Sequence, residues 1–208
     1  MQELEICEIF YSLQGESGYM GMPCIFVRLA GCNLRCRFCD TTYSHAPGKM
    51  MSFEQILVEI ATYPAKVVEL TGGEPLWQEA CPALMEVLLQ KGYKVLLETN
   101  GAMYIDEVPR EVVKILDVKC PGSGEGGSFQ KANLKLMAPW DELKFVLTGF
   151  HDYQYAKSFV REHKLEGRVL HFSPVTNMLP AELLAEWLLR DGLQVKLSLQ
   201  LHKLLNLR

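Results

Sequence analysis

The chain has 208 residues, of which 49% are hydrophobic and 22% are charged, so it can bury a substantial core and is too apolar for a disordered protein. Its 21 Lys and Arg against 25 Asp and Glu give a net charge of -4, which is not the overall charge of a protein that binds nucleic acid or anionic membranes. The N-terminal residues lack a targeting pattern and no apolar run reaches the length of a membrane span, so we expect a cytoplasmic protein that contacts neither nucleic acid nor membrane.

Short β-rich apolar runs alternate with helical patterns along the chain, which is typical of βαβ units and a parallel sheet. We expect strands at 24–30, 66–71, 94–99, 115–119, 142–148, 168–172 and 195–199, and helices at 53–62, 81–91, 153–163 and 181–190. Ser52 and Gln55 make a capping box at the start of the first helix, and Gly92 is suited to end the second.

The length then limits the fold. A closed eightfold (β/α) barrel typically needs about 250 residues. We therefore predict an α/β fold in which a parallel sheet forms an incomplete, shortened (β/α)6-type barrel. Residues 1–208 should form a single domain with short N- and C-terminal extensions.

Between the first predicted strand and the first helix, Cys32, Cys36 and Cys39 form a C-x3-C-x2-C triplet. Iron-sulfur clusters are normally held by four cysteines, so three clustered thiolates suit a [4Fe-4S] cluster whose fourth iron stays open to a small molecule. A structural zinc site that lacks its fourth ligand, or a grouping of buried thiols without a metal, are the alternatives.

The remaining cysteines show no ligand-like spacing and are expected to be free thiols: Cys7, Cys24, Cys81 and Cys120. Cys120 follows the strand at 115–119 and opens a glycine-rich loop, so among these four thiols it is the one placed where it could face the cavity. That loop is either a flexible connection or a segment that becomes ordered over a ligand.

Polar motifs follow the second and third predicted strands. Thr71-Gly72-Gly73-Glu74-Pro75 comes after the strand at 66–71, and Glu98-Thr99-Asn100-Gly101 ends the strand at 94–99. Each motif is compatible with a simple turn. Because the carboxyl ends of barrel strands meet at one face, both are also placed to bind a ligand there.

The cysteine triplet followed by the Gly-Gly-Glu-Pro element resembles the radical S-adenosylmethionine (SAM) superfamily. In that superfamily the open iron binds the amino and carboxylate groups of SAM, and the reduced cluster cleaves SAM to a 5'-deoxyadenosyl radical. The resemblance implies the incomplete radical SAM barrel as the fold. It also implies that the Gly-Gly-Glu-Pro element holds the amino group of SAM.

Ser12-Leu13-Gln14-Gly15-Glu16 before the triplet, and Cys39-Asp40-Thr41-Thr42-Tyr43 at its end, narrow the resemblance to the 7-carboxy-7-deazaguanine synthase family. The family converts 6-carboxy-5,6,7,8-tetrahydropterin to 7-carboxy-7-deazaguanine with loss of ammonia, on the route to queuosine and other deazapurines. The resemblance implies a [4Fe-4S] cluster, SAM and Mg2+ as cofactors. It also implies a homodimer that takes electrons from an external reductant such as flavodoxin.

The family's motifs transfer to this chain residue by residue. The catalytic cluster is implied to rest on Cys32, Cys36 and Cys39, and Mg2+ on Thr41. The contacts implied for the substrate are Leu13, Gln14, Gly15, Arg28 and Thr71, and those implied for SAM are Gly73, Glu74, Ser123 and Ser173.

The physical chemistry of three of these side chains agrees with their implied roles. Arg28 interrupts an apolar strand and needs an anionic partner, which is either the substrate carboxylate or an internal Asp or Glu. Gln14 offers donors and an acceptor to a pterin edge, or caps a turn. The Thr41 hydroxyl is an oxygen ligand of the kind Mg2+ prefers, unless it bonds to its own backbone in a turn.

Two other functions remain as alternatives. One is a radical SAM activase that abstracts hydrogen from a glycine of a partner protein, since activases share the C-x3-C-x2-C spacing. The other is a non-catalytic metal-binding module.

Overall fold

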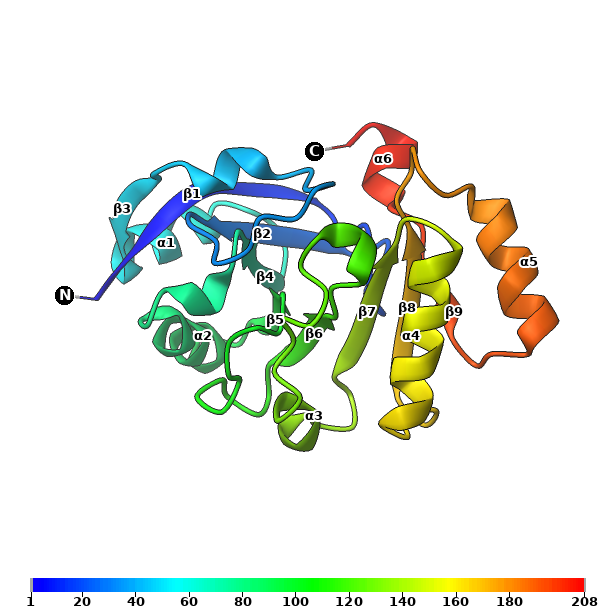
Figure 1. Cartoon of the computed structure of the whole chain (residues 1–208). Helices are drawn as coiled ribbons and strands as arrows, with labels where there is room; N and C mark the ends of the chain where they lie inside the picture. Colours follow the sequence, from blue (N-terminus) through cyan, green and yellow to red (C-terminus); the bar gives the residue numbers. More distant parts are fainter. Residues whose placement is uncertain (1, 208) are drawn as a thin grey trace.

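Across residues 2–207, which the computed structural model describes, nine strands form one sheet in the order β3-β1-β2-β4-β5-β6-β7-β8-β9 (Figure 1). The strands are β1 (Glu3–Leu13), β2 (Pro23–Leu29), β3 (Lys49–Ser52), β4 (Val67–Gly72), β5 (Lys94–Thr99), β6 (Val113–Asp117), β7 (Glu142–Leu147), β8 (Val169–Pro174) and β9 (Lys196–Leu197). Strands β2 and β4 to β9 pair in parallel, whereas β1 pairs antiparallel with β2 and β3.

The helices are α1 (Phe53–Ile60), α2 (Cys81–Gln90), α3 (Asn133–Leu136), α4 (Phe150–Glu162), α5 (Ala181–Asp191) and α6 (Leu201–Leu205). Short 3-10 helices add η1 (Thr42–His45), η2 (Pro75–Trp77) and η3 (Pro121–Ser123). Helix α1 packs on β1 and β3, α2 on β5, α4 on β7 and α5 on β9. The sheet ends at β3 and β9 without closing, which confirms the incomplete α/β barrel.

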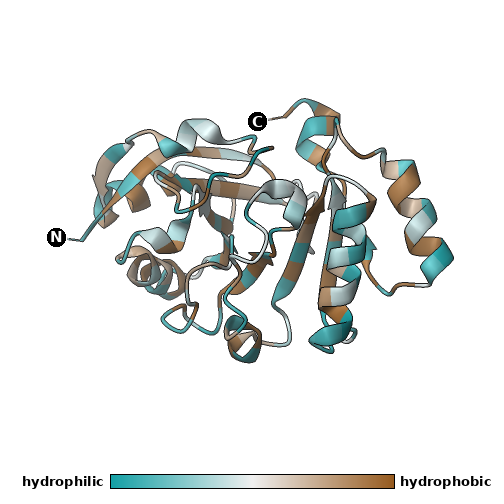
Figure 2. Ribbon diagram, viewed as in Figure 1, coloured by the Kyte–Doolittle hydropathy of each residue, from teal (hydrophilic) through white to brown (hydrophobic). Residues whose placement is uncertain are grey.

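The two faces of the sheet are buried differently. The face under the helices carries the large core, and the side of α4 away from the sheet is hydrophilic (Figure 2). The opposite face carries a smaller apolar cluster, the inner plug, made of Phe10, Cys24, Phe26, Val67, Leu96, Val113 and Ile115. The inner plug fills one end of the barrel interior with apolar side chains. Polar side chains lie at the other end, where the parallel strands have their carboxyl ends.

Strand β1 was not predicted, because its apolar residues do not keep to one face. Leu4 and Ile6 belong to the core under the helices, whereas Phe10 belongs to the inner plug. The register with β2 shifts between Ile6 and Glu8. Such a bulge moves every later side chain to the other face, which removes the simple alternation expected of a strand.

Most predicted elements are confirmed within a few residues, including the capping box, in which Gln55 N donates to Ser52 Oγ over 3.2 Å and Ser52 N donates to Gln55 Oε1 over 2.8 Å. Gly92 follows α2 with a φ of 79°, which a glycine adopts without strain. The strand predicted at 115–119 is wrong by two residues, because β6 begins at Val113. Lys114 broke the apolar pattern, but it is buried against Asp141, with Nζ 3.3 Å from Oδ2.

The remaining differences concern short elements. Helix α4 begins three residues before the predicted 153–163, and β9 spans only two of the residues at 195–199. The short elements β3, α3 and α6 were not predicted. Among residues 2–207, no helix has the length and apolar character needed to cross a membrane.

Candidate active site

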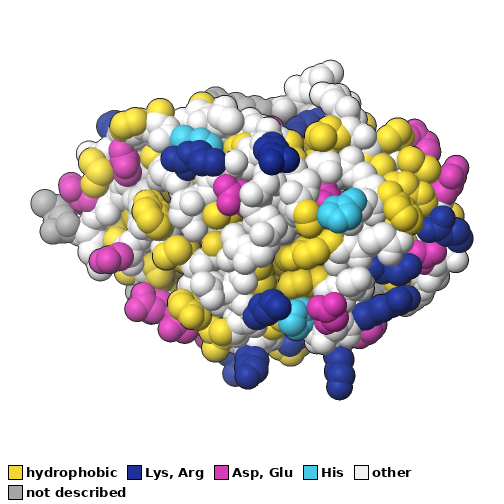
Figure 3. Space-filling model, viewed as in Figure 1, with side chains coloured by type: hydrophobic (Ala, Val, Ile, Leu, Met, Phe, Trp, Pro, Cys, Tyr) yellow, Lys and Arg dark blue, Asp and Glu magenta, His cyan; other side chains and the backbone are white. Residues whose placement is uncertain are grey.

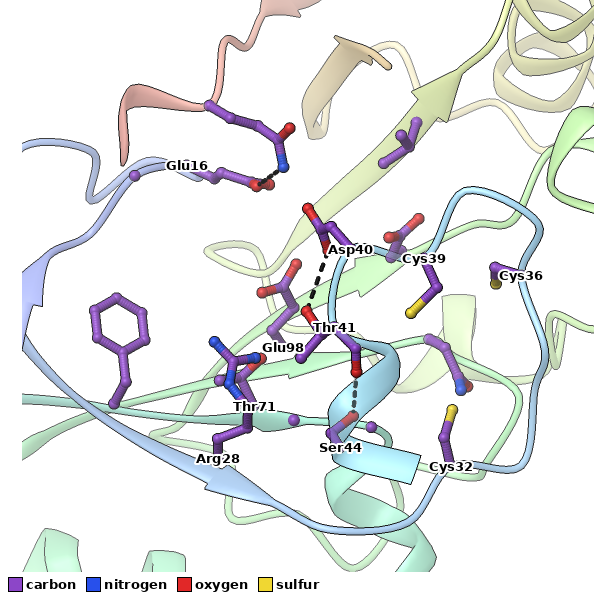
Figure 4. A pocket seen from close by; sticks show the side chains of 18 of the residues that line it. Glu16, Arg28, Cys32, Cys36, Cys39, Asp40, Thr41, Ser44, Thr71 and Glu98 are labelled. Atoms are coloured by element: carbon purple, nitrogen blue, oxygen red, sulfur yellow. Dashed lines mark hydrogen bonds between the residues drawn. The ribbon is translucent and has the colours of Figure 1, made fainter. Parts of the chain in front are cut away.

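A cavity of about 430 Å³ lies at the carboxyl ends of the parallel strands. Most of the predicted site residues line it: Leu13, Gln14, Gly15, Arg28, Cys32, Cys36, Cys39, Thr41, Thr71 and Gly73. These residues come from β1, β2, β4 and the loop between β2 and β3, so the fold gathers them from separate parts of the chain (Figure 4). The other three predicted contacts, Glu74, Ser123 and Ser173, do not line it.

The cysteine loop, residues 31–40, presents its three thiols to one space. Cys32, Cys36 and Cys39 are half-buried, and their sulfur atoms turn toward the region that the loop encloses (Figure 4). Leu34 N donates to Cys32 Sγ over 3.4 Å, and Cys39 N donates to Cys36 O over 3.2 Å. Burial raises the pKa of the Cys32 and Cys36 thiols, so binding a metal there would displace protons.

Three thiols on one loop suit an iron-sulfur cluster that has one open iron. Among residues 2–207, no group of three or more His, Cys, Asp and Glu side chains is placed to hold one metal ion. Beside the loop, Asp117 lines the cavity and its buried Oδ1 has no hydrogen-bond partner among the described residues, so it is available to a donor on a ligand.

The glycines after β4 allow the backbone to approach the cysteine loop. A Cβ on Gly73 would lie 2.0 Å from the Gly31 carbonyl oxygen and 2.9 Å from Cys32 Cβ. Gly73 N donates to Leu29 O over 3.2 Å, and Glu74 N donates to Gly31 O over 2.9 Å. Residue 73 must therefore be glycine for the loop to keep this position.

Glu74 supports the site from beneath. Its buried carboxylate accepts hydrogen bonds from Leu76 N at 3.0 Å, Thr99 Oγ1 at 2.8 Å and Asn100 N at 2.7 Å. Asn100 Nδ2 in turn donates to Asn33 Oδ1 in the cysteine loop over 2.8 Å. Burial raises the pKa of Glu74 although these donors oppose the shift. Glu74 thus joins the motifs after β4 and β5, and its side chain points away from the cavity predicted to hold SAM.

Ser123 and Ser173 are also buried and do not line the cavity. Ser123 Oγ donates to Cys120 O over 2.6 Å, and Ser123 O accepts from Arg37 N at 2.9 Å, which ties the glycine-rich loop to the cysteine loop. Ser173 lies within β8, paired with Val146. Cys120 does not face the cavity: it is a free thiol, and its side chain is buried in the core under the helices.

Arg28 has an internal partner, which was the alternative to a substrate carboxylate. Its Nε lies 2.8 Å from Glu8 Oε1, and Tyr43 donates its hydroxyl to the same oxygen over 2.9 Å. The guanidinium also lies 5.7 Å from the Phe10 ring centroid. Arg28 nevertheless lines the cavity, so Glu8 orients it without removing it from the site.

Gln14 is oriented by its neighbours. Its Oε1 accepts from Glu16 N at 2.6 Å, and its Nε2 donates to Oε2 of the buried Glu69. Thr41 directly precedes η1, and its hydroxyl donates to Asp40 Oδ1 over 3.1 Å rather than to its own backbone. Both side chains therefore reach the cavity in defined orientations.

A network of charged side chains lines the cavity on the side next to the inner plug. Lys144 Nζ lies 2.6 Å from Glu16 Oε2 and 3.9 Å from Asp117 Oδ2, and it also bonds to Glu98. Lys119 Nζ lies 2.7 Å from Asp117 Oδ2. Burial opposes the charge on Lys144, but these carboxylates raise its pKa well above the usual range. The lysine that interrupts the apolar β7 is the sequence signal for this network.

The C-terminal segment closes the cavity from the other side. Leu201 N donates to Gly15 O over 2.9 Å, and Gln200 Nε2 donates to Glu16 Oε1 over 2.8 Å. A Cβ on Gly15 would lie 2.2 Å from His202 Nδ1, so a side chain there would displace the histidine. The Ser-Leu-Gln-Gly-Glu motif and the C-terminal Gln-Leu-His-Lys segment thus meet at the cavity.

Comparison with known proteins agrees with this geometry. The Radical SAM superfamily model matches residues 27–118. The 7-carboxy-7-deazaguanine synthase of Koribacter versatilis (strain Ellin345) is 48% identical, with 96% of each chain covered. The protein of the same name from Chlorobaculum tepidum is 45% identical, with 96% of this chain and 93% of the relative covered.

Solved structures share the fold. The crystal structure of QueE from Escherichia coli superposes with a TM-score of 0.80 over 96% of this chain and 95% of that chain, at 23% identity. SuiB of Streptococcus suis bound to S-adenosylmethionine superposes with a TM-score of 0.55 over 81% of this chain and 44% of that chain, at 12% identity.

Proposed function

This chain belongs to the 7-carboxy-7-deazaguanine synthase family of radical SAM enzymes, and on that premise we propose that it converts 6-carboxy-5,6,7,8-tetrahydropterin to 7-carboxy-7-deazaguanine with loss of ammonia. The reaction lies on the route to queuosine and other 7-deazapurines. One observation carries the proposal: the three thiols of the cysteine loop line the same cavity as Gln14, Arg28 and Thr71. A cofactor and a small polar substrate would meet there.

Cys32, Cys36 and Cys39 would hold a [4Fe-4S] cluster with one iron open to SAM. When bound, this cofactor pair supplies a 5'-deoxyadenosyl radical that removes hydrogen from C6 of the pterin, and SAM is regenerated. Gly73, whose missing side chain allows the cysteine loop to lie against it, lines the cavity and would contact SAM. Glu74 and Ser123 would position the loops around SAM, and Ser173 of β8 pairs with Val146, which lines the cavity.

The substrate would be oriented by the residues on the β1 and β2 side of the cavity. Arg28, directed by Glu8, presents its guanidinium to the pterin carboxylate. Leu13, Gln14, Gly15 and Thr71 contact the ring.

Thr41 would offer its hydroxyl to Mg2+, with substrate oxygens and water completing the shell. Lys144 stays protonated between its carboxylates and holds Glu16 and Glu98 at defined positions. Beyond the cavity, family membership supports a single domain over residues 1–208, a homodimer in the cytoplasm and an external reductant such as flavodoxin.

An anaerobic turnover assay tests the proposed function. The reconstituted protein receives SAM, a reductant, Mg2+ and 6-carboxytetrahydropterin, and mass spectrometry detects a product lighter than the pterin by one ammonia. Appearance of 5'-deoxyadenosine without this product would leave the cluster and SAM in place but overturn the substrate. A protein glycine would then be the next substrate to assay.

A further inference from the structure

Glu69 is a buried carboxyl group in the cavity that the family resemblance did not single out. It lies in β4, where the register places it between Phe26 of β2 and Leu96 of β5. Both neighbours belong to the inner plug. Glu69 is 1% exposed and lines the cavity, so it stands at the boundary between the apolar plug and the polar site.

The other cavity carboxylates have cationic partners. Glu16 and Glu98 share Lys144, Asp117 pairs with Lys119, Glu8 with Arg28, and Asp40 with Lys203. Within the described part of the chain, no lysine, arginine or histidine lies within 4.0 Å of Glu69. A buried carboxylate without a cation is costly unless donors reach it.

The hydrogen bonding around Glu69 leaves it an acceptor for a ligand. Gln14 donates Nε2 to Glu69 Oε2, and the Gln14 carbonyl is engaged by Glu16 N at 2.6 Å. Gln14 therefore acts as a donor toward Glu69 and orients its carboxyl group. Burial, followed by the nearby Glu98 charge, raises the pKa of Glu69 well above its usual range, while Gln14 and Lys144 oppose the shift and Glu16 adds to it. Perturbed carboxyl groups in clefts are typical of functional positions.

We propose that Glu69 accepts two hydrogen bonds from the pyrimidine edge of the pterin, one from the 2-amino group and one from N3–H, and so selects this ring. The inference rests on the proposed function and assigns a specificity-determining residue to it. A carboxylate presents two acceptors side by side, which matches two adjacent N–H donors. Phe10 and Phe26 also line the cavity, stacked with centroids 4.9 Å apart, and add apolar surface beside the carboxyl.

The opposite end of the substrate has its own partner. The pterin carboxylate is assigned to Arg28. Arg28 and Glu69 would therefore bind opposite ends of the substrate, the carboxylate and the pyrimidine edge. Replacing the 2-amino group by an oxo group turns a donor into an acceptor and places it against the Glu69 carboxylate. That change gives the lumazine analogue of the substrate, which is the discriminating probe.

The experiment compares the cluster-loaded wild-type protein with Glu69→Gln, Glu69→Asp and the control Glu86→Gln. Glu86 is exposed on α2, away from the cavity, and its replacement removes the same charge. Turnover is measured with 6-carboxytetrahydropterin and with its lumazine analogue. Calorimetry measures binding of the stable oxidised forms, 6-carboxypterin and 6-carboxylumazine.

For Glu69→Gln we expect about 100-fold weaker pterin binding, the scale of losing hydrogen bonds to a charged group. The loss should appear as a higher KM, and the preference for pterin over lumazine should collapse because the introduced amide donates to the 2-oxo group. Glu69→Asp should keep the preference with intermediate affinity, and Glu86→Gln should match wild type. SAM cleavage in the absence of pterin should be the same in Glu86→Gln as in wild type.

Two results would overturn the inference: equal binding of pterin and lumazine by wild type, or an unchanged preference in Glu69→Gln. Either can occur while wild type still makes 7-carboxy-7-deazaguanine, in which case the proposed function stands. If wild type binds pterin with a preference that depends on Glu69 but forms no deazapurine, the proposed reaction fails and the Glu69 contact stands.

Discussion

Lys203 Nζ lies 2.6 Å from Asp40 Oδ2, which ties helix α6 to the residue between Cys39 and Thr41. The two residues are 163 positions apart in the chain and meet at the mouth of the cavity. Lys203 holds the pKa of Asp40 down at about 2, against the opposing effect of burial. Positive and negative side chains are interspersed on the face seen in Figure 3. The Lys203–Asp40 pair differs from other surface ion pairs because it lies beside the cysteine loop.

Lys203→Met should affect catalysis more than stability. The side chains of Lys203 and Asp40 are 37% and 53% exposed, so solvent screens their attraction and the change in unfolding free energy should stay below about 1 kcal/mol. Loss of the tie should raise the KM for the pterin and increase uncoupled formation of 5'-deoxyadenosine. Steady-state kinetics and thermal melts measure both quantities, and a large drop in melting temperature with unchanged KM would contradict this assignment.

Lys144→Met should strongly destabilise the protein. The variant leaves Glu16 and Glu98 without their shared cation in a buried site, and breaking a buried pair costs about 3–5 kcal/mol. Chemical denaturation measures the loss. Lys157→Met is the control, because its partner Asp191 lies outside the cavity and keeps hydrogen bonds from Tyr153 and Arg190, and it should cost clearly less.

Cys36→Ala should abolish both the brown colour of the reconstituted cluster and SAM cleavage. Cys120→Ala is the matched control, since that thiol is buried in the core away from the cavity. Absorption spectra and 5'-deoxyadenosine assays distinguish the two variants. Full SAM cleavage by Cys36→Ala would exclude this cysteine from the cluster.

Gly73→Ala should displace the cysteine loop, because the new Cβ would lie 2.0 Å from the Gly31 carbonyl oxygen. The atom that the Cβ meets belongs to the backbone, which cannot rotate away as a side chain can. The overpacking should therefore lower the free energy of unfolding by about 1–3 kcal/mol and lower the iron content. At Gly167 a Cβ meets no atom within 4 Å, so Gly167→Ala should keep wild-type stability and iron content. Equal iron content in the two variants would show that the contact is dispensable.

Glu69→Gln should stabilise the substrate-free protein at alkaline pH. The folded-state pKa of Glu69 is raised, so the carboxylate destabilises the fold above that pKa, and wild type gains stability as pH falls toward the ordinary glutamate pKa of 4.5. The variant should therefore melt higher than wild type at pH 8, and the difference should vanish near pH 4. A lower melting temperature at pH 8 would mean that the charge supports the fold.

Much of the fold follows from local patterns. The apolar runs at 24–30, 66–71 and 94–99 became β2, β4 and β5, because a parallel strand buried on both faces reads as a continuous apolar segment. Strand β1 escaped prediction because its bulge transfers Phe10 to the face opposite Leu4 and Ile6.

The site, like the fold, has features that local sequence predicts and features that depend on distant residues. The C-x3-C-x2-C spacing placed three thiols on one loop, because close neighbours in the chain are close in space whatever the fold. Glu74 was assigned to SAM from its motif, yet its carboxylate points at Thr99 and Asn100. The direction of a side chain depends on partners 25 residues or more away, which a motif does not contain.

The sequence by itself therefore determined the cysteine loop, the alternation of strands and helices, and the family to which the chain belongs. Only the tertiary structure decided which polar groups meet: Lys144 with Glu16 and Glu98, Arg28 with Glu8, and Glu69 with Gln14. The physical reason is that hydrogen bonds and ion pairs act over a few ångströms in space, and the chain brings residues to that distance only after the sheet has formed.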